Sequence, residues 1–237
     1  MPFGEVAVKK HDRGLLDDRP RFRVIVQFVH IKKGADKIMN GMEMNVQYFR
    51  MINDLGKQYP ALNPVFFVIA EYTVYVLALI ALLYWFSRKH ENRIMVICGT
   101  ITFVLAEVLG KIAGTLHYNA QPFAELTDVN QLVFKAVNNS FPSDHTMLFF
   151  SFCITFLLFQ KTRGILWIPF AIVVGLSRIW VGVHYPADVL VGALISIGSA
   201  LAVYMLVPHL RIVQAGLELY EKAERAVLPA KAKTKGY

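Results

Sequence analysis

The sequence VFFVIAEYTVYVLALIALLYWF, which runs from Val65 to Phe86, decides the fold of this chain. At about 1.5 Å per helical residue it extends roughly 33 Å, enough to cross the hydrocarbon core of a membrane. The charged sequence Ser87-Arg88-Lys89-His90 follows directly and is typical of a segment at the membrane interface. The core of a soluble domain does not require a helix of this length, so the stretch predicts an integral membrane protein.

Further apolar segments lie at residues 94–115, 145–160, 165–183 and 186–207. Backbone groups in lipid must be hydrogen-bonded internally, and these runs do not alternate apolar and polar residues as barrel strands do. We therefore predict an all-α integral membrane protein with about five transmembrane helices in one bundle. Apolar residues at helical spacing before the first span and after the last indicate flanking amphipathic surface helices.

The same patterns predict the domain boundaries. Residues 44–228 form the membrane domain, and residues 229–237 form a basic tail whose composition is typical of disorder. Residues 1–43 form an N-terminal extension without the apolar core of a signal peptide. One explanation of this basic extension is that translation begins at Met44; another is that long tails escape the charge rule of membrane topology.

The net charge of +8 does not indicate nucleic acid binding, because the basic residues gather in the tails and short loops. Membrane topology produces this distribution by itself. The loops after the first and third spans carry Arg88, Lys89, Arg93, Lys161 and Arg163, and the C-terminal tail is basic, whereas the segment 116–144 is acidic on balance. We therefore expect the basic loops on the cytoplasmic side and the segment 116–144 on the outer side.

The first polar stretch of interest is Phe-Pro-Ser-Asp-His at residues 141–145, where a predicted span begins. Ser143 suits the N-cap of a helix, and the free amides of such a terminus bind anions. His145 lies in the first turn and can reach a bound anion. An ordinary capped helix with an interfacial histidine would have the same sequence.

The second polar stretch is SRIWVGVHYPAD at residues 177–188, between two predicted spans. An unpaired Arg178 near the end of a span is costly, and its planar fork of donors fits a phosphate. The spacing allows Asp188 to accept a hydrogen bond from one nitrogen of His184, which leaves the other nitrogen free to attack. Together, the two stretches predict a site that binds a phosphate and attacks it.

Pro-Ser-Asp-His at 142–145 and Ser-Arg-x5-His-x3-Asp at 177–188 resemble the type 2 phosphatidic acid phosphatase family, which shares its site with vanadium haloperoxidases. The third family motif is matched in full, and the second differs in having Asp144 where most members have Gly. This variant is similar to bacterial undecaprenyl-diphosphate phosphatases of the bacitracin-resistance type. The similarity covers about residues 44 to 228.

The first family motif, Lys-x6-Arg-Pro, is not matched. Gln121 precedes Pro122 where the family has Arg, and the preceding lysine is Lys111 instead of residue 114. Three residues are close to one helical turn, so Lys111 can face the same pocket as a residue at position 114 would, from one turn earlier in the helix. Glutamine donates to phosphate but brings no charge, which leaves Lys111 and Arg178 to supply the electrostatics.

The resemblance implies a two-step phosphoryl transfer that needs no metal or cofactor. His184 attacks phosphorus, His145 protonates the leaving oxygen, and Asp188 orients His184. The implied phosphate-binding residues are Lys111, Arg178, Gln121, Ser143 and Asp144.

Two acidic residues in the predicted spans are candidates for a supporting role. Glu107 either positions Lys111 or only neutralises it within the membrane. Glu71 lies on the same membrane side as the motifs; it either orders water, or the diphosphate through an ion, or has no role in the site.

The resemblance also implies the substrate and the location. We expect an enzyme of the bacterial cytoplasmic membrane that dephosphorylates undecaprenyl diphosphate at the outer face, recycles the carrier lipid for peptidoglycan synthesis and confers bacitracin resistance. Its expected partners are this polyprenyl diphosphate and membrane lipids, without nucleic acid or an obligate protein partner. The alternatives are a phosphatase of phosphatidic acid or phosphatidylglycerol phosphate, a lipid flippase, and a metal-dependent phosphohydrolase built from His117, Asp144, His145 and His184.

Overall fold

A computed structural model describes residues 41–227, which fall into two units with a boundary between Gln47 and Tyr48. The expected N-terminal extension, apart from residues 41–43, and the expected basic tail lie outside the described residues. The described part of the second unit is helical, with an isolated β-bridge between Ala120 and Asn139. The predicted all-α class is confirmed.

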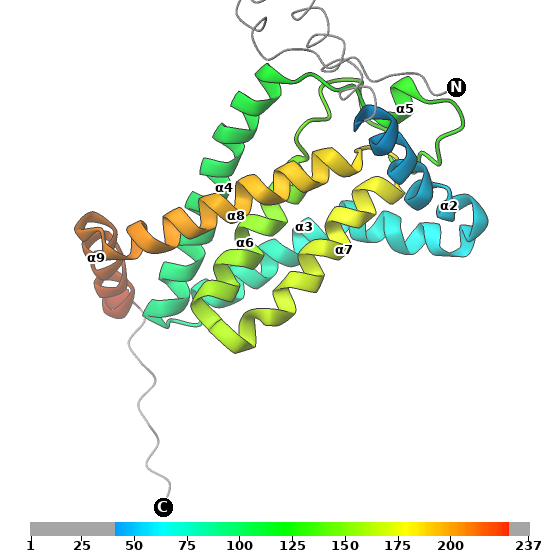
Figure 1. Ribbon diagram of the computed structural model, residues 1–237. Coiled ribbons are helices and arrows are strands. Elements are labelled where there is room, and N and C mark those ends of the chain that lie inside the picture. Colours follow the sequence, from blue (N-terminus) through cyan, green and yellow to red (C-terminus); the bar gives the residue numbers. More distant parts are fainter. Residues whose placement is uncertain (1–40, 228–237) are drawn as a thin grey trace, which may run out of the picture. The chain divides into compact units, whose positions relative to one another are not determined.

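The long helices form an antiparallel bundle (Figure 1): α3 (Asn63–Phe86), α4 (His90–Leu116), α6 (Asp144–Gln160), α7 (Trp167–Trp180) and α8 (Pro186–Leu206). Within residues 41–227, four helical stretches are long and apolar enough to cross a membrane. One of them, Asp144–Trp180, contains both α6 and α7, because the 3-10 turn η2 (Lys161–Leu166) joins the two helices into a hairpin. The chain therefore reverses direction within this stretch, and the membrane bundle predicted from the sequence is confirmed.

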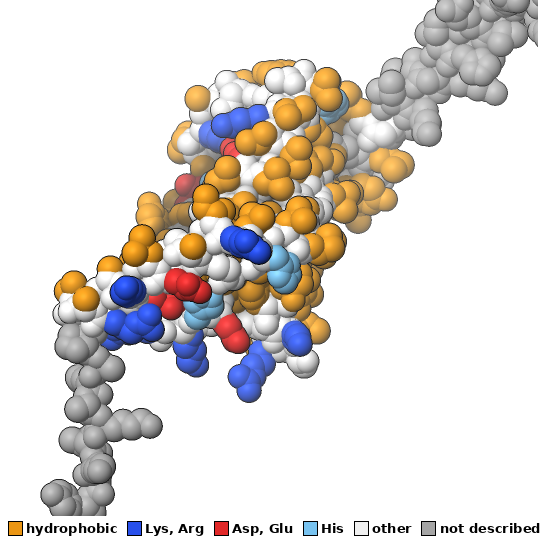
Figure 2. All heavy atoms as spheres, turned by 90° about the vertical axis from the view of Figure 1, so that its left-hand side faces the viewer, with side chains coloured by type: hydrophobic (Ala, Val, Ile, Leu, Met, Phe, Trp, Pro, Cys, Tyr) orange, Lys and Arg blue, Asp and Glu red, His pale blue; other side chains and the backbone are white. Residues whose placement is uncertain are grey.

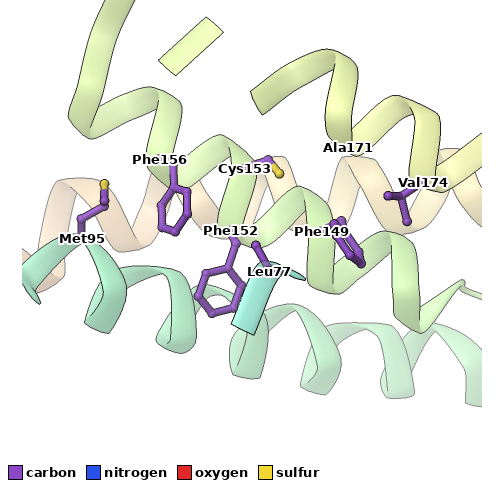
Figure 3. Close-up of a cluster of buried hydrophobic side chains, with 8 residues drawn as sticks. All are labelled: Leu77, Met95, Phe149, Phe152, Cys153, Phe156, Ala171 and Val174. Carbon is purple, nitrogen blue, oxygen red and sulfur yellow. The ribbon is translucent and has the colours of Figure 1, made fainter. Parts of the chain in front are cut away.

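Helix α6 is the centre of the bundle, because it packs against α4, α7 and α8. Its aromatic face buries Phe149, Phe152 and Phe156 against Leu77 of α3 and Val174 of α7 (Figure 3). Burial of such side chains stabilises the bundle and fixes the start of α6 relative to its neighbours.

Close approach of α8 to α6 depends on small residues. A Cβ atom on Gly192 would lie 3.1 Å from the carbonyl oxygen of Ser143. One turn later, the Ser196 hydroxyl donates to the carbonyl oxygen of Met147 at 3.0 Å. These contacts hold the starts of α6 and α8 side by side, as small residues do between membrane helices.

Shorter elements flank the bundle. In the second unit they are the helical residues 48–53, then α2 (Leu55–Gln58), η1 (Pro60–Leu62), α5 (Pro122–Glu125), η3 (Val207–His209) and α9 (Arg211–Val227). In α9, Leu217 packs against Ile94 and Cys98 of α4 and Val203 of α8. Figure 2 shows that charged side chains gather at the end of the bundle where α9 lies, whereas hydrophobic side chains cover much of the rest of that face.

Candidate active site

The two polar stretches meet at one end of the bundle. The backbone N–H of Ser143 donates to the carbonyl oxygen of Asp188 at 3.2 Å, which ties the start of α6 to the start of α8. The irregular segment 117–143 folds back over the same end, and the N–H of Ser140 donates to the carbonyl oxygen of Asn119 at 2.7 Å. The site is therefore built from helix ends and one long connection.

His184 lies buried in the turn between α7 and α8. Its Nδ1 is 2.9 Å from the carbonyl oxygen of Ser140 and 3.7 Å from Oδ2 of Asp188. A carbonyl oxygen only accepts, so Nδ1 carries the proton and Nε2 presents its lone pair. The hydrogen bond that the sequence predicted between His184 and Asp188 is thus made to the Ser140 carbonyl, with Asp188 beside it at ion-pair distance.

The charge state of His184 also suits a nucleophile. Burial lowers the pKa of His184 below its ordinary value; the carboxylate of Asp188 opposes this shift, and the charges of Arg178 and Lys135 add to it. The imidazole therefore stays neutral at physiological pH. A neutral imidazole with a free Nε2 can attack phosphorus.

Asp188 is fully buried and accepts three hydrogen bonds. Oδ1 accepts from Nδ2 of Asn119 at 3.1 Å, and Oδ2 accepts from the Ser140 hydroxyl and the Tyr185 N–H, both at 2.8 Å. These donors occupy the carboxylate, which explains why His184 turns to the Ser140 carbonyl. Asn119 and Ser140 were not predicted as site residues, because their roles depend on how the irregular segment folds.

Arg178 is 2% exposed at the end of α7. Its Nη1 donates to the carbonyl oxygen of Ala70 at 2.8 Å and to Oε1 of Glu71 at 3.0 Å, whereas its Nε is buried without a hydrogen-bond partner. Glu71 is therefore the protein partner of the guanidinium. The unsatisfied Nε is a donor that a phosphate oxygen would satisfy.

His145 is half-buried in the first turn of α6 and close enough to Arg178 and His184 to feel the charge of each. Ser143 precedes the helix as its N-cap, and its hydroxyl accepts from Thr146 at 3.0 Å. The structure thus brings together both histidines and the guanidinium, as the sequence predicted.

Lys111, Glu107 and Asp144 line a pocket of about 350 Å³ between α4 and the start of α6. Glu107 is within electrostatic range of both other residues, and its Oε1 is buried without a hydrogen-bond partner. Lys111 and Asp144 are exposed, so a head group can reach them.

The set proposed for a metal-dependent alternative is not gathered. The ring of His117 packs edge-on against Phe141. Within residues 41–227, no group of three or more His, Cys, Asp and Glu side chains is placed to hold a metal ion.

Gln121 is fully buried, and both ends of its amide are occupied. Oε1 accepts from the N–H of Asn138 at 2.9 Å, and Nε2 donates to Oδ1 of Asn138 and to the carbonyl oxygen of Ala136. Lys135, which precedes this anchored segment, is close enough to both His145 and His184 for its charge to act on them. Sequence analysis did not predict Lys135, since it belongs to no motif and to no periodic segment.

Two imidazoles and a guanidinium gathered at the end of a membrane bundle are groups suited to an integral-membrane phosphatase. The chain belongs to the PAP2 superfamily, whose family model matches residues 112–212. It is 52% identical over 196 residues to the bacitracin transport permease protein BcrC of Bacillus licheniformis, covering 83% of this chain and 97% of that protein. These similarities confirm the family that the motifs indicated.

Two further relatives agree. Undecaprenyl-diphosphatase BcrC of Bacillus subtilis is 32% identical over 154 residues, which is 65% of this chain and 79% of that protein. Among solved structures, LpxE of Aquifex aeolicus superimposes with a TM-score of 0.59 at 29% identity, over 68% of this chain and 95% of that one.

Proposed function

We propose that this protein hydrolyses undecaprenyl diphosphate to undecaprenyl phosphate and inorganic phosphate. The observation that carries the proposal is the environment of His184, whose Nδ1 faces the Ser140 carbonyl 2.9 Å away. This contact leaves Nε2 as the nucleophile in a site that also holds Arg178 and His145. The relatives named above support the choice of substrate, since one is an undecaprenyl-diphosphatase and another carries the name BcrC.

The reaction has two steps. Nε2 of His184 forms a bond to the terminal phosphorus as the bond from phosphorus to the bridging oxygen breaks, and protonated His145 gives its proton to that oxygen. His145 then takes a proton from water, which attacks the phosphorus and breaks the bond to His184. Asp188, 3.7 Å from Nδ1, stabilises the positive charge that develops on the ring.

The pocket beside the start of α6 suits the rest of the head group. Lys111 supplies a cation there, with Glu107 within electrostatic range of it. The lipid-linked phosphate in this pocket would lie next to His145, which protonates the oxygen between the two phosphates. In this proposal Lys111 and Asp144 contact the head group, and the prenyl chain leaves sideways into the membrane.

We place the protein in the bacterial cytoplasmic membrane with this site facing outward. Lys89, Lys161 and Arg163 line one cavity of about 1150 Å³ at the opposite end of the bundle, and basic residues favour the cytoplasmic side. Both native cysteines, Cys98 and Cys153, are buried. A cysteine introduced at Tyr118 should therefore react with a membrane-impermeant maleimide in intact cells, whereas one at Thr162 should not; the reverse result would invert the topology.

Phosphate release by the purified protein in detergent tests the function directly. We expect faster release from undecaprenyl diphosphate than from phosphatidic acid or phosphatidylglycerol phosphate, with activity that survives EDTA. His184→Ala and His145→Ala should abolish release, whereas His209→Ala, an exposed histidine at the other end of the bundle, should not. Preference for either phospholipid would reject the substrate, and an active His184→Ala variant would reject the mechanism.

A second candidate is a lipid flippase without chemistry; the Bacillus licheniformis relative is named a bacitracin transport permease, which makes a transport function worth testing. A transporter needs the basic pocket only to bind head groups. It would keep its function in cells after His184→Ala, whereas a phosphatase would lose it. Bacitracin resistance of cells that carry this variant separates the two candidates.

A further inference from the structure

The positive charge near His184 is too small to balance an anionic phosphate, because that of Arg178 is already compensated. Glu71 lies 3.0 Å from its Nη1 and compensates its positive charge, and the Asp188 carboxylate adds a negative charge beside His184. The terminal phosphate of a diphosphate is an anion, and phosphoryl transfer spreads further charge over its oxygens. An additional cation is needed on the open side of the site.

Lys135 is placed to provide this cation. It is half-buried, and its ammonium group forms no hydrogen bond or ion pair with any other residue of the described range 41–227. Lys135 is nevertheless within electrostatic range of both histidines. A half-buried ammonium without a protein partner is costly unless a ligand supplies the counter-charge.

The backbone on either side of Lys135 is held. Before it, the N–H of Leu132 donates to the carbonyl oxygen of Val181 at 3.2 Å, and Val133 is buried with Val181 and Val183. Val183 precedes the nucleophile, so this anchor ties the segment directly to the His184 turn. After Lys135, the Gln121 amide holds Ala136 and Asn138 on both of its ends.

We propose that Lys135 binds the terminal phosphate together with Arg178, and that Gln121 is a positioning residue that holds the Lys135 segment in place. The inference rests on the proposed function, because it assigns this cation to the phosphate of that substrate. Gln121 stands where the family motif has arginine, but its amide is hydrogen-bonded to the segment 136–138 and is not available to a phosphate. The charge missing at position 121 is thus supplied from Lys135.

The test uses the full chain purified in detergent, with phosphate release from undecaprenyl diphosphate as the first measurement. Lys135→Ala should lower kcat by roughly a hundredfold, the usual effect of removing one donor to a developing anion. Lys135→Arg should restore most of that loss, because it keeps the charge. Lys161→Ala, an exposed lysine at the other end of the bundle, is the matched control and should leave kcat unchanged.

Orthovanadate provides a second measurement that needs no turnover, because it has the shape and charge of phosphate. Ligand binding raises the temperature of unfolding, so orthovanadate should stabilise the wild type and Lys135→Arg but not Lys135→Ala. If the wild type hydrolyses none of the lipids and this pattern still holds, the proposed function is wrong and the role of Lys135 stands. Equal stabilisation of Lys135→Ala and wild type would overturn the inference.

A double-mutant cycle tests the role of Gln121. Gln121→Ala should lower kcat by roughly tenfold in the wild type, as expected for loss of anchoring hydrogen bonds. In the Lys135→Ala background it should cost little, because the cation that it positions is already absent. If its full effect persists in that background, Gln121 acts on phosphate independently and the positioning role is wrong.

Discussion

Replacement of Asp188 by asparagine separates two functions that a carboxylate beside a catalytic histidine can have. It can hold the tautomer of the ring, and it can stabilise positive charge on the ring. In this protein the Ser140 carbonyl holds the proton on Nδ1 at 2.9 Å, whereas the carboxylate of Asp188 lies 3.7 Å away. We therefore expect Asp188→Asn to remove the charge and leave the tautomer in place.

The expected magnitude follows from the distance. Two unit charges 3.7 Å apart interact by about 4 kcal/mol at an effective dielectric constant of roughly 20. The amide dipole of asparagine keeps part of this, so kcat should fall by about 30- to 1000-fold. That is less than the loss of about 10⁴ seen where an aspartate alone sets the tautomer.

Stability should fall as well, because Asp188 accepts from Asn119, Ser140 and the Tyr185 N–H. An asparagine oxygen in the Oδ2 position keeps two of these bonds, and Asn119 can turn its amide to accept from the new N–H. In Asp188→Asn these hydrogen bonds go to a neutral amide instead of a carboxylate, and each loses about 1 kcal/mol of its contribution to stability. We expect a loss of about 2–3 kcal/mol in the free energy of unfolding.

The measurements are single-turnover phosphate release and denaturant unfolding of the purified variant, with Glu218→Gln on α9 as the matched control. The carboxylate raises the pKa of His184, so its removal lowers that pKa further and the acid limb of kcat/KM should move to lower pH. A loss of about 10⁴ or more in a folded variant would show that Asp188 sets the tautomer. A loss below about tenfold would show that its charge does not act on the ring.

Three further outcomes are expected. Lys135→Met removes a charge that lowers the pKa of His184, so the acid limb of its rate profile should move to higher pH than in the wild type. Gly182→Ala places a side chain at a φ of 83°, and denaturant unfolding should show a loss of at least about 1–2 kcal/mol, with slower turnover because the turn carries the nucleophile. Arg93→Met removes the buried guanidinium that binds the α9 carboxylates, so amide exchange in Arg211–Val227 should accelerate while phosphate release is unchanged.

The sequence predicted the bundle well, because long apolar segments leave few choices in lipid. The span expected at residues 186–207 is α8 (Pro186–Leu206), and the one expected at 94–115 is α4 (His90–Leu116). The expected fourth span differs more: residues 181–183 belong to the His184 turn and not to α7 (Trp167–Trp180). The positive φ of Gly182 ends that helix, and hydropathy alone does not report backbone conformation.

The site was predictable only where short spacings determine geometry. Arg178, His184 and Asp188 are linked by a helix end and a turn, and the structure places them together, as predicted from the motif. Ser140 and Lys135 come from a segment with neither helical nor strand periodicity, whose path is set by contacts with distant residues. No local pattern indicates that a carbonyl of this segment meets His184 at 2.9 Å.

On our proposal, position 121 is a place where a family motif has changed while the chemistry that it serves is kept. A motif records which residue occupies a position, whereas a phosphate requires a positive charge at a point in space. Gln121 is buried, and both ends of its amide bond the segment that follows Lys135. In our proposal this segment brings Lys135 to the phosphate, which the arginine of the family motif would otherwise reach from position 121. On the proposal above, an arginine placed at 121 would break these bonds and move Lys135, so restoring the family motif should lower activity in this chain. The substitution Gln121→Arg therefore distinguishes a site that lacks a cation, which it would improve, from a site that has one elsewhere, which it would damage.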